Sequence, residues 1–157
     1  MLERGRKAYL RSEWAPAAEE MQRFLALSPP EDEAMEATYA LGHSLFQLHK
    51  IEPAMPMLER YVAGDKKLKN RDFAMLMLVQ VYDQVGQKDK ATELARDAIN
   101  QYPSGEFVNG FRMRLKRVEA AGAAAATPTP APTANTPAPQ PVKAAAPAAA
   151  PVPAAHP

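Results

Sequence analysis

Apolar residues recur through the first 120 residues at the spacing of helices. Between Trp14 and Leu27 they fall three or four residues apart, which is the period of an amphipathic helix. No stretch shows the strict alternation of apolar and polar residues that marks a strand, so the pattern predicts an all-α fold. The expected helices span about 2–12, 14–27, 35–48, 52–62, 73–85, 89–101 and 105–120.

Residues that start, stop or turn helices divide this series into pairs. Ser12 is expected to cap the second helix, because its hydroxyl can accept a backbone N–H that has no partner within the helix. Pro29 and Pro30 are expected to end that helix, since the residue before a proline avoids helical geometry. Gly86 falls at the turn between the fifth and sixth helices.

Residue types also recur at an offset of 37 residues. Ala17, Ala54 and Ala91 share this spacing, and Gly5 matches Gly42. A fixed period of this length indicates a repeat array, in which one helix pair is copied and stacked. Small side chains at such positions let the two helices of a unit approach closely, and larger ones would force them apart.

These recurring residues resemble the tetratricopeptide repeat, with three units and a closing helix. The usual period of that family is 34 residues, whereas this chain has 37. Lys66 and Val79 replace a proline and a glycine of the pattern. The resemblance rests on Gly5, Trp14, Ala17, Met21, Phe24 and Pro29, on Gly42, Ala54, Leu58 and Tyr61, and on Leu78, Tyr82, Ala91, Ala95, Ala98 and Pro103.

The resemblance implies an antiparallel helix-pair solenoid within residues 1–121. Its units are expected at about 1–30, 35–65 and 72–103, followed by a capping helix at 105–120. A terminal helix with one polar face is what a stacked array needs to close its end.

Composition separates this domain from residues 122–157. That segment holds ten of the sixteen prolines and a single charged residue, Lys143. Proline favours an extended, solvated backbone, so the segment is predicted to be a disordered Pro/Ala-rich tail. Residues 1–121 hold eighteen acids and eighteen bases. A neutral domain has no general attraction to nucleic acid, which is therefore not an expected partner.

The sequence also bears on compartment. It has no cysteine, which excludes disulfides and cysteine catalysis. Its opening has no apolar core of a signal peptide, and no run reaches the roughly 18 apolar residues that span a bilayer. A cytoplasmic protein with no direct membrane insertion is expected. If the chain is trimmed at its N-terminus, a periplasmic or envelope location is the alternative.

Candidate chemistry is sparse. His43 and His49 lie six residues apart and do not share a helix face, so no metal site is expected. Ser44 lacks the glycines of a nucleophile motif, and no glycine-rich loop for phosphates is present. The sequence therefore predicts a protein that is not an enzyme and needs no cofactor. An enzyme, or its regulatory half, remains an alternative supported only by exposed acids and His43.

In the resembling family, the first helix of each pair lines a concave groove that holds peptide ligands. Aromatic groups serve as anchors there and polar groups set the register. The alternative for Tyr39, Phe46 and Leu76 is simple packing between neighbouring helices. Carried onto this chain, the groove residues are Arg6, Tyr9, Tyr39, His43, Phe46, Gln47, Leu76, Gln80, Asp83 and Gln84.

The resulting prediction is a non-catalytic scaffold or adaptor that binds a peptide or helical segment of another protein. Similarity of residues 101–107 to periplasmic repeat proteins suggests, as an alternative, a bacterial cell-envelope assembly factor. A secretion chaperone and a self-associating array are further alternatives. The basic stretches 66–71 and 112–117 are interpreted as a solvated loop and a polar helix face, or as docking points for an acidic partner.

Overall fold

A computed structural model describes residues 1–126, and all regular structure in that range is helical. No strand occurs among these residues, so the all-α prediction is confirmed. The predicted tail residues 127–157 lie outside the described range. The helices are α1 (Leu2–Leu10), α2 (Trp14–Leu25), α3 (Glu31–Gln47), α4 (Ile51–Ala63), α5 (Arg71–Gln84), α6 (Lys88–Gln101) and α7 (Val108–Ala126).

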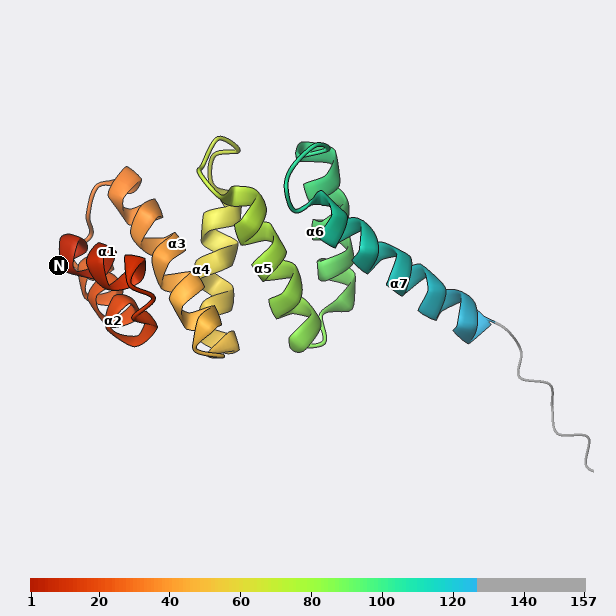
Figure 1. Cartoon of the computed structure of the whole chain (residues 1–157), viewed down its shortest axis with the longest axis horizontal. Helices are drawn as coiled ribbons and strands as arrows, with labels where there is room; N and C mark the ends of the chain where they lie inside the picture. Colours follow the sequence, from red (N-terminus) through yellow and green to blue (C-terminus); the bar gives the residue numbers. More distant parts are fainter. Residues whose placement is uncertain (127–157) are drawn as a thin grey trace, which may run out of the picture. The chain divides into compact units, whose positions relative to one another are not determined.

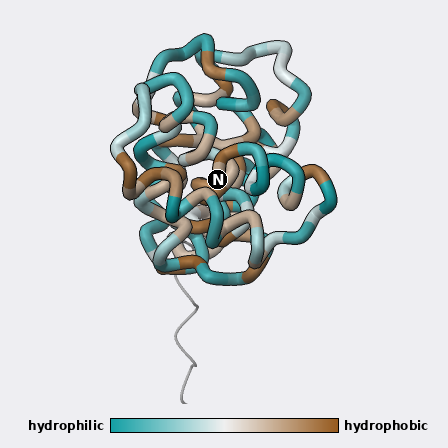
Figure 2. The backbone as a smooth tube through the Cα atoms, turned by 90° about the vertical axis from the view of Figure 1, so that its left-hand side faces the viewer, coloured by the Kyte–Doolittle hydropathy of each residue, from teal (hydrophilic) through white to brown (hydrophobic). Residues whose placement is uncertain are grey.

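The helices pack in chain order, each against the next (Figure 1). Contacts also join α1 to α3 and α3 to α5, so the first helices of successive pairs are neighbours. We call the surface lined by side chains of α1, α3 and α5 the first-helix face. Figure 2 shows hydrophobic and hydrophilic residues mixed along the tube, as expected for helices that each bury one side.

The turn inside each helix pair has the same backbone geometry. Its central residue is Ser12, His49 or Gly86, with φ of 58°, 57° and 81°, and these residues are 37 positions apart. The following N–H reaches back to a carbonyl five residues earlier at 2.9, 2.9 and 2.8 Å. This is a Schellman-type ending, which satisfies carbonyls left free at a helix C-terminus. The backbone therefore repeats with the period that the sequence predicts.

The predicted role of Ser12 as a helix cap is wrong. Ser12 occupies the left-handed position that ends α1, and the residue at the start of α2 is Glu13, which makes no side-chain capping bond. The recurring turn takes precedence here, because its geometry places residue 12 one position too early to cap the following helix.

Small residues allow the close helix contacts expected from the repeat. Ala17, Ala54 and Ala91 are completely buried. A Cβ added to Gly5 would lie 2.9 Å from Met21, and one added to Gly42 would lie 3.1 Å from Leu58. Each contact joins residues sixteen apart, at equivalent positions of the first two units. The third unit has Val79 at this position, 2% exposed within the core.

The core has two parts. A small cluster holds Ala18 and Met21 of α2 against Ala37, Ala40 and Leu41 of α3. A larger cluster extends from α3 to α7, with Phe111 of α7 only 1% exposed. The first helix pair packs on α3 through this separate, smaller cluster, whereas the later helices share one continuous core.

Arg71 belongs to this core and not to a solvated loop. Its side chain donates to the carbonyl of Val62 at 2.9 and 2.6 Å, to Gln101 at 2.6 Å and to Tyr102 at 3.2 Å. The Val62 carbonyl lies in the last turn of α4, where carbonyls lack helical partners. Arg71 therefore joins the end of the second unit to the end of the third.

Helix α7 closes the array. It begins at Val108 and continues to Ala126, so residues 122–126, predicted as tail, are helical. Phe111 and Leu115 turn toward the core, while Arg112, Met113 and most other residues of α7 are exposed. Within residues 1–126, no helix has both the length and the apolar character needed to cross a bilayer.

Candidate partner-binding site

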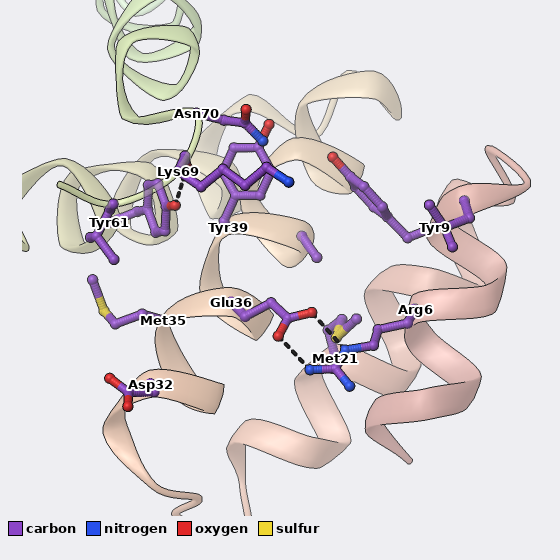
Figure 3. Close-up of a pocket in the computed structure, with 13 residues that line it drawn as sticks. Arg6, Tyr9, Met21, Asp32, Met35, Glu36, Tyr39, Tyr61, Lys69 and Asn70 are labelled. Carbon is purple, nitrogen blue, oxygen red and sulfur yellow. Dashed lines mark hydrogen bonds and ion pairs between the residues drawn. The ribbon is translucent and has the colours of Figure 1, made fainter.

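A pocket of about 600 Å³ opens between α1, α3 and the loop that joins α4 to α5 (Figure 3). Ligand pockets in proteins commonly have volumes of about 300–1,000 Å³. Three of the predicted groove residues line it: Arg6 and Tyr9 from α1, and Tyr39 from α3. The pocket thus lies on the first-helix face, at the junction of the first two units.

One wall of the pocket is an ion pair between α1 and α3. Arg6 donates to Glu36 through Nε at 2.6 Å and through Nη2 at 2.5 Å, and its Nη1 donates to Glu3 at 2.5 Å. The bonds from Arg6 hold the pKa of Glu36 below its usual value, and the two carboxylates raise the pKa of the guanidinium. Arg6 therefore braces the two helices and has no spare charge for an anionic ligand.

Three tyrosines form a second wall. Tyr39 stands between the other two, with ring centroids 6.4 Å from Tyr9 and 5.0 Å from Tyr61. Burial raises the pKa of Tyr9 and Tyr39, and raises the pKa of Tyr61 to about 12. The phenols stay protonated at neutral pH. Tyr61 uses its hydroxyl to hold the backbone carbonyl of Lys69, which positions the loop beside the pocket.

His43 lies behind this wall, where it meets rings from the first and third units. Its ring centroid is 5.5 Å from Tyr9, 5.3 Å from Trp14 and 5.5 Å from Phe73. Nδ1 is 2.5 Å from the Tyr9 hydroxyl and Nε2 is 3.0 Å from the Gln47 amide. Burial lowers the pKa of His43, so the neutral ring is favoured. Nδ1 thus joins α3 to α1, whereas Nε2 is engaged within α3.

These rings belong to a longer series, which we call the aromatic row: Tyr9, Trp14, Tyr39, His43, Tyr61, Phe73 and Phe107. The row passes from the first unit to the segment before α7. Four of its members, Trp14, Tyr61, Phe73 and Phe107, are absent from the predicted groove. The signal in the sequence for Phe73 and Phe107 is a spacing of 34 residues, which joins Tyr39 to Phe73 and Phe73 to Phe107.

The other predicted groove residues lie in different surroundings. Phe46 and Leu76 are partly buried against the core, whereas Gln47, Gln80 and Gln84 are exposed. Asp83 accepts hydrogen bonds from Arg114 of α7 at 2.7 and 2.5 Å. The structure therefore brings Arg6, Tyr9, Tyr39, His43 and Gln47 together in the first two units. It places Leu76 and Asp83 beside α7.

The floor and rim of the pocket come from residues that the sequence pattern does not mark as site residues. Met21 and Met35 are 1% and 7% exposed and form part of an apolar floor. Leu68 and Lys69 reach the pocket from the α4–α5 loop, and Asp32 from the first turn of α3. Loop residues of this kind have no helical period that would reveal which side they face.

The pocket is lined by aromatic, apolar and ion-paired side chains. Among residues 1–126, no three acidic or histidine side chains are arranged to hold a metal ion. A scan of protein-family models finds none that matches this chain, and no curated protein that was searched matches it. The chain is a seven-helix protein with packed adjacent helix pairs, an arrangement compatible with a helical repeat.

Proposed function

We propose that this protein is a non-catalytic scaffold that binds a segment of a partner protein on its first-helix face. The observation that carries the proposal is the pocket of about 600 Å³ between the first two units, flanked by the aromatic row. Tyrosine and tryptophan provide large, rigid contact areas with a polar end, which makes them common anchors in protein interfaces.

The proposal includes membership of the tetratricopeptide-like helical repeats. Its support is the agreement of two signals at 37 residues: buried alanines, and left-handed turns that are closed by the same hydrogen bond. Such arrays present the first helices of their units side by side, which leaves one continuous surface for a ligand.

Preorganisation supports binding at this place. The Arg6–Glu36 pair and the Tyr9–His43 hydrogen bond already hold α1 against α3 before any partner arrives. Binding a partner then costs little conformational entropy in this protein, so more of the favourable contact free energy contributes to affinity. The same pairings engage Arg6, Glu36 and His43 in structural contacts, which favours binding over proton transfer by these groups.

Site-specific photo-crosslinking tests the proposal. A benzophenone amino acid at Lys69 and, separately, at Gln47 is expected to crosslink one and the same partner segment in cells of the source organism. The matched control carries the group at Asn100, an exposed residue of α6, and is expected to give no such product. Equal crosslinking from Asn100, or none from Lys69 and Gln47, would overturn the proposal.

A further inference from the structure

The charges around the pocket are arranged unevenly. Four charged residues line it, and two of them, Arg6 and Glu36, neutralise each other. The other two, Asp32 and Lys69, are exposed, and within residues 1–126 their side chains make no ion pair. One free negative and one free positive group therefore remain on the rim, on different elements.

Apart from the Arg6–Glu36 pair and Asn70, the rest of the lining is mostly apolar or aromatic. Met21, Met35 and Ala40 are each less than a tenth exposed, and tyrosine rings form the walls. Leu10 also lines the pocket, and its side chain is 81% exposed and accessible to a ligand. Methionines adapt their shape to different apolar groups, so such a floor accepts more than one kind of large side chain.

We infer that the pocket takes a protein segment with a large apolar or aromatic anchor, flanked by an acid toward Lys69 and a base toward Asp32. This inference rests on the proposed function and names the chemistry of the partner. Apolar anchors match the floor, and the opposite flanking charges match the two free rim charges. Because those rim charges differ in sign, a bound segment is held in one direction along the first-helix face.

Four short synthetic peptides test the inference. Each has the same central Phe-Leu anchor, acetylated and amidated ends, and one charged residue on either side: Glu then Lys, Lys then Glu, two Glu, or two Lys. Binding to the full 157-residue chain is followed by fluorescence anisotropy. One of the two mixed-charge peptides is expected to bind best, by about two- to fivefold per matched pair, and alanine in place of the anchor is expected to abolish binding.

Charge reversal on the protein gives the decisive comparison. Lys69→Glu makes both rim charges negative, so the peptide with two lysines is expected to become the best ligand. Asp32→Lys makes both positive, so the peptide with two glutamates is expected to bind best. The double reversal is expected to switch preference between the two mixed peptides. These preferences should shrink at high salt, because both rim groups are exposed.

The control is a charge reversal elsewhere. Glu93→Lys combined with Arg96→Glu alters two exposed residues of α6 and should leave the peptide ranking unchanged. Circular dichroism checks that every variant keeps its helix content. An unchanged ranking in the rim variants, or anchor-independent binding, would overturn the inference.

If the peptide experiments fail, crosslinking of a partner from Lys69 and Gln47 would still support the proposed function. Absence of both peptide binding and crosslinking would remove the function together with the inference.

Discussion

The two ends of the first-helix face differ in what covers them. Between α1 and α3 the face is open and holds the pocket. Along α5 it is partly covered by α7 and the residue before it: Arg114 of α7 binds Asp83, and the ring centroid of Phe107, just before α7, lies 5.0 Å from that of Phe73. A methyl group on Gly110 would lie 3.5 Å from Leu76. The helix that closes the array therefore uses surface that would otherwise be available to a partner.

Units of similar structure therefore differ in what their first helices contact. The third unit contributes its first-helix face to the stability of the array, whereas the first two units keep theirs accessible. Of the two buried clusters, the one that holds the first helix pair against α3 is also the smaller. We expect substitutions in the C-terminal half to affect folding and those at the rim of the pocket to affect binding.

The largest effect is expected from Phe111→Ala, which removes the buried anchor of α7. Phe111 is 1% exposed, and loss of such a side chain typically lowers the free energy of unfolding by about 3–5 kcal/mol. Urea unfolding measures the loss, and hydrogen exchange should show faster exchange in α7. Met113→Ala is the control, since Met113 is 63% exposed on the same helix. Unaltered hydrogen exchange in α7 would contradict the conclusion that Phe111 anchors this helix to the core.

A smaller effect is expected from Arg71→Ala, at the boundary between the two halves. The variant leaves the Val62 carbonyl and the Gln101 amide oxygen without this donor, which should lower the free energy of unfolding by about 2–4 kcal/mol. Arg71→Lys should recover only part of the loss, because an ammonium group lacks the planar fork. Arg96→Ala, at an exposed site on α6, should change stability by less than about 0.5 kcal/mol.

Two glycines test close packing in the two halves. Gly42→Ala should lower the free energy of unfolding by about 1 kcal/mol, because the new Cβ would lie 3.1 Å from Leu58 and 3.2 Å from Met57. Gly110→Ala should raise it by about 0.5 kcal/mol, since alanine favours helix and meets Leu76 at an ordinary distance. Thermal unfolding of both variants checks the opposite signs. Stabilisation by Gly42→Ala would contradict this prediction and show that α4 shifts to accommodate the added methyl group.

The smallest effect is a dependence of stability on pH. Burial places the pKa of His43 in the folded protein below its ordinary value of about 6.5. The unfolded chain therefore binds a proton more readily, so stability is full above the ordinary pKa and falls as pH drops through the folded pKa. Melting temperatures between pH 7.5 and 5 should fall less in His43→Gln than in the wild type. Parallel curves would exclude His43 as a source of the change.

The sequence predicts the helices and their pairwise packing well because the signals for them are local and periodic. Alanines and glycines at 37-residue intervals report helix contacts within each unit, and these contacts are present. Helix α3 begins at Glu31, four residues before the predicted start at residue 35, because Glu31, Asp32 and Glu33 form its first turn at the positive end of the helix dipole.

The candidate site is less predictable because it joins residues from different elements. Arg6, Tyr9 and Tyr39 follow from the family resemblance and do line the pocket. The resemblance does not predict that Glu36 and Lys69 line the pocket. Whether they do so depends on how far neighbouring helices are shifted along one another. Residues that touch across first helices are often 30 or 34 positions apart, whereas equivalent residues are 37 apart. A repeat alignment alone does not report that difference.

The recurring left-handed turn has a consequence for the growth of such chains. Because Ser12, His49 and Gly86 end their helices in the same way, a block cut from one turn to the next has matching ends. Duplicating residues 50–86 in tandem should lengthen the protein by one helix pair, because the new junction would have the same turn geometry as the existing ones. Gene duplication could therefore extend this array in whole steps, and a designer could do so as well.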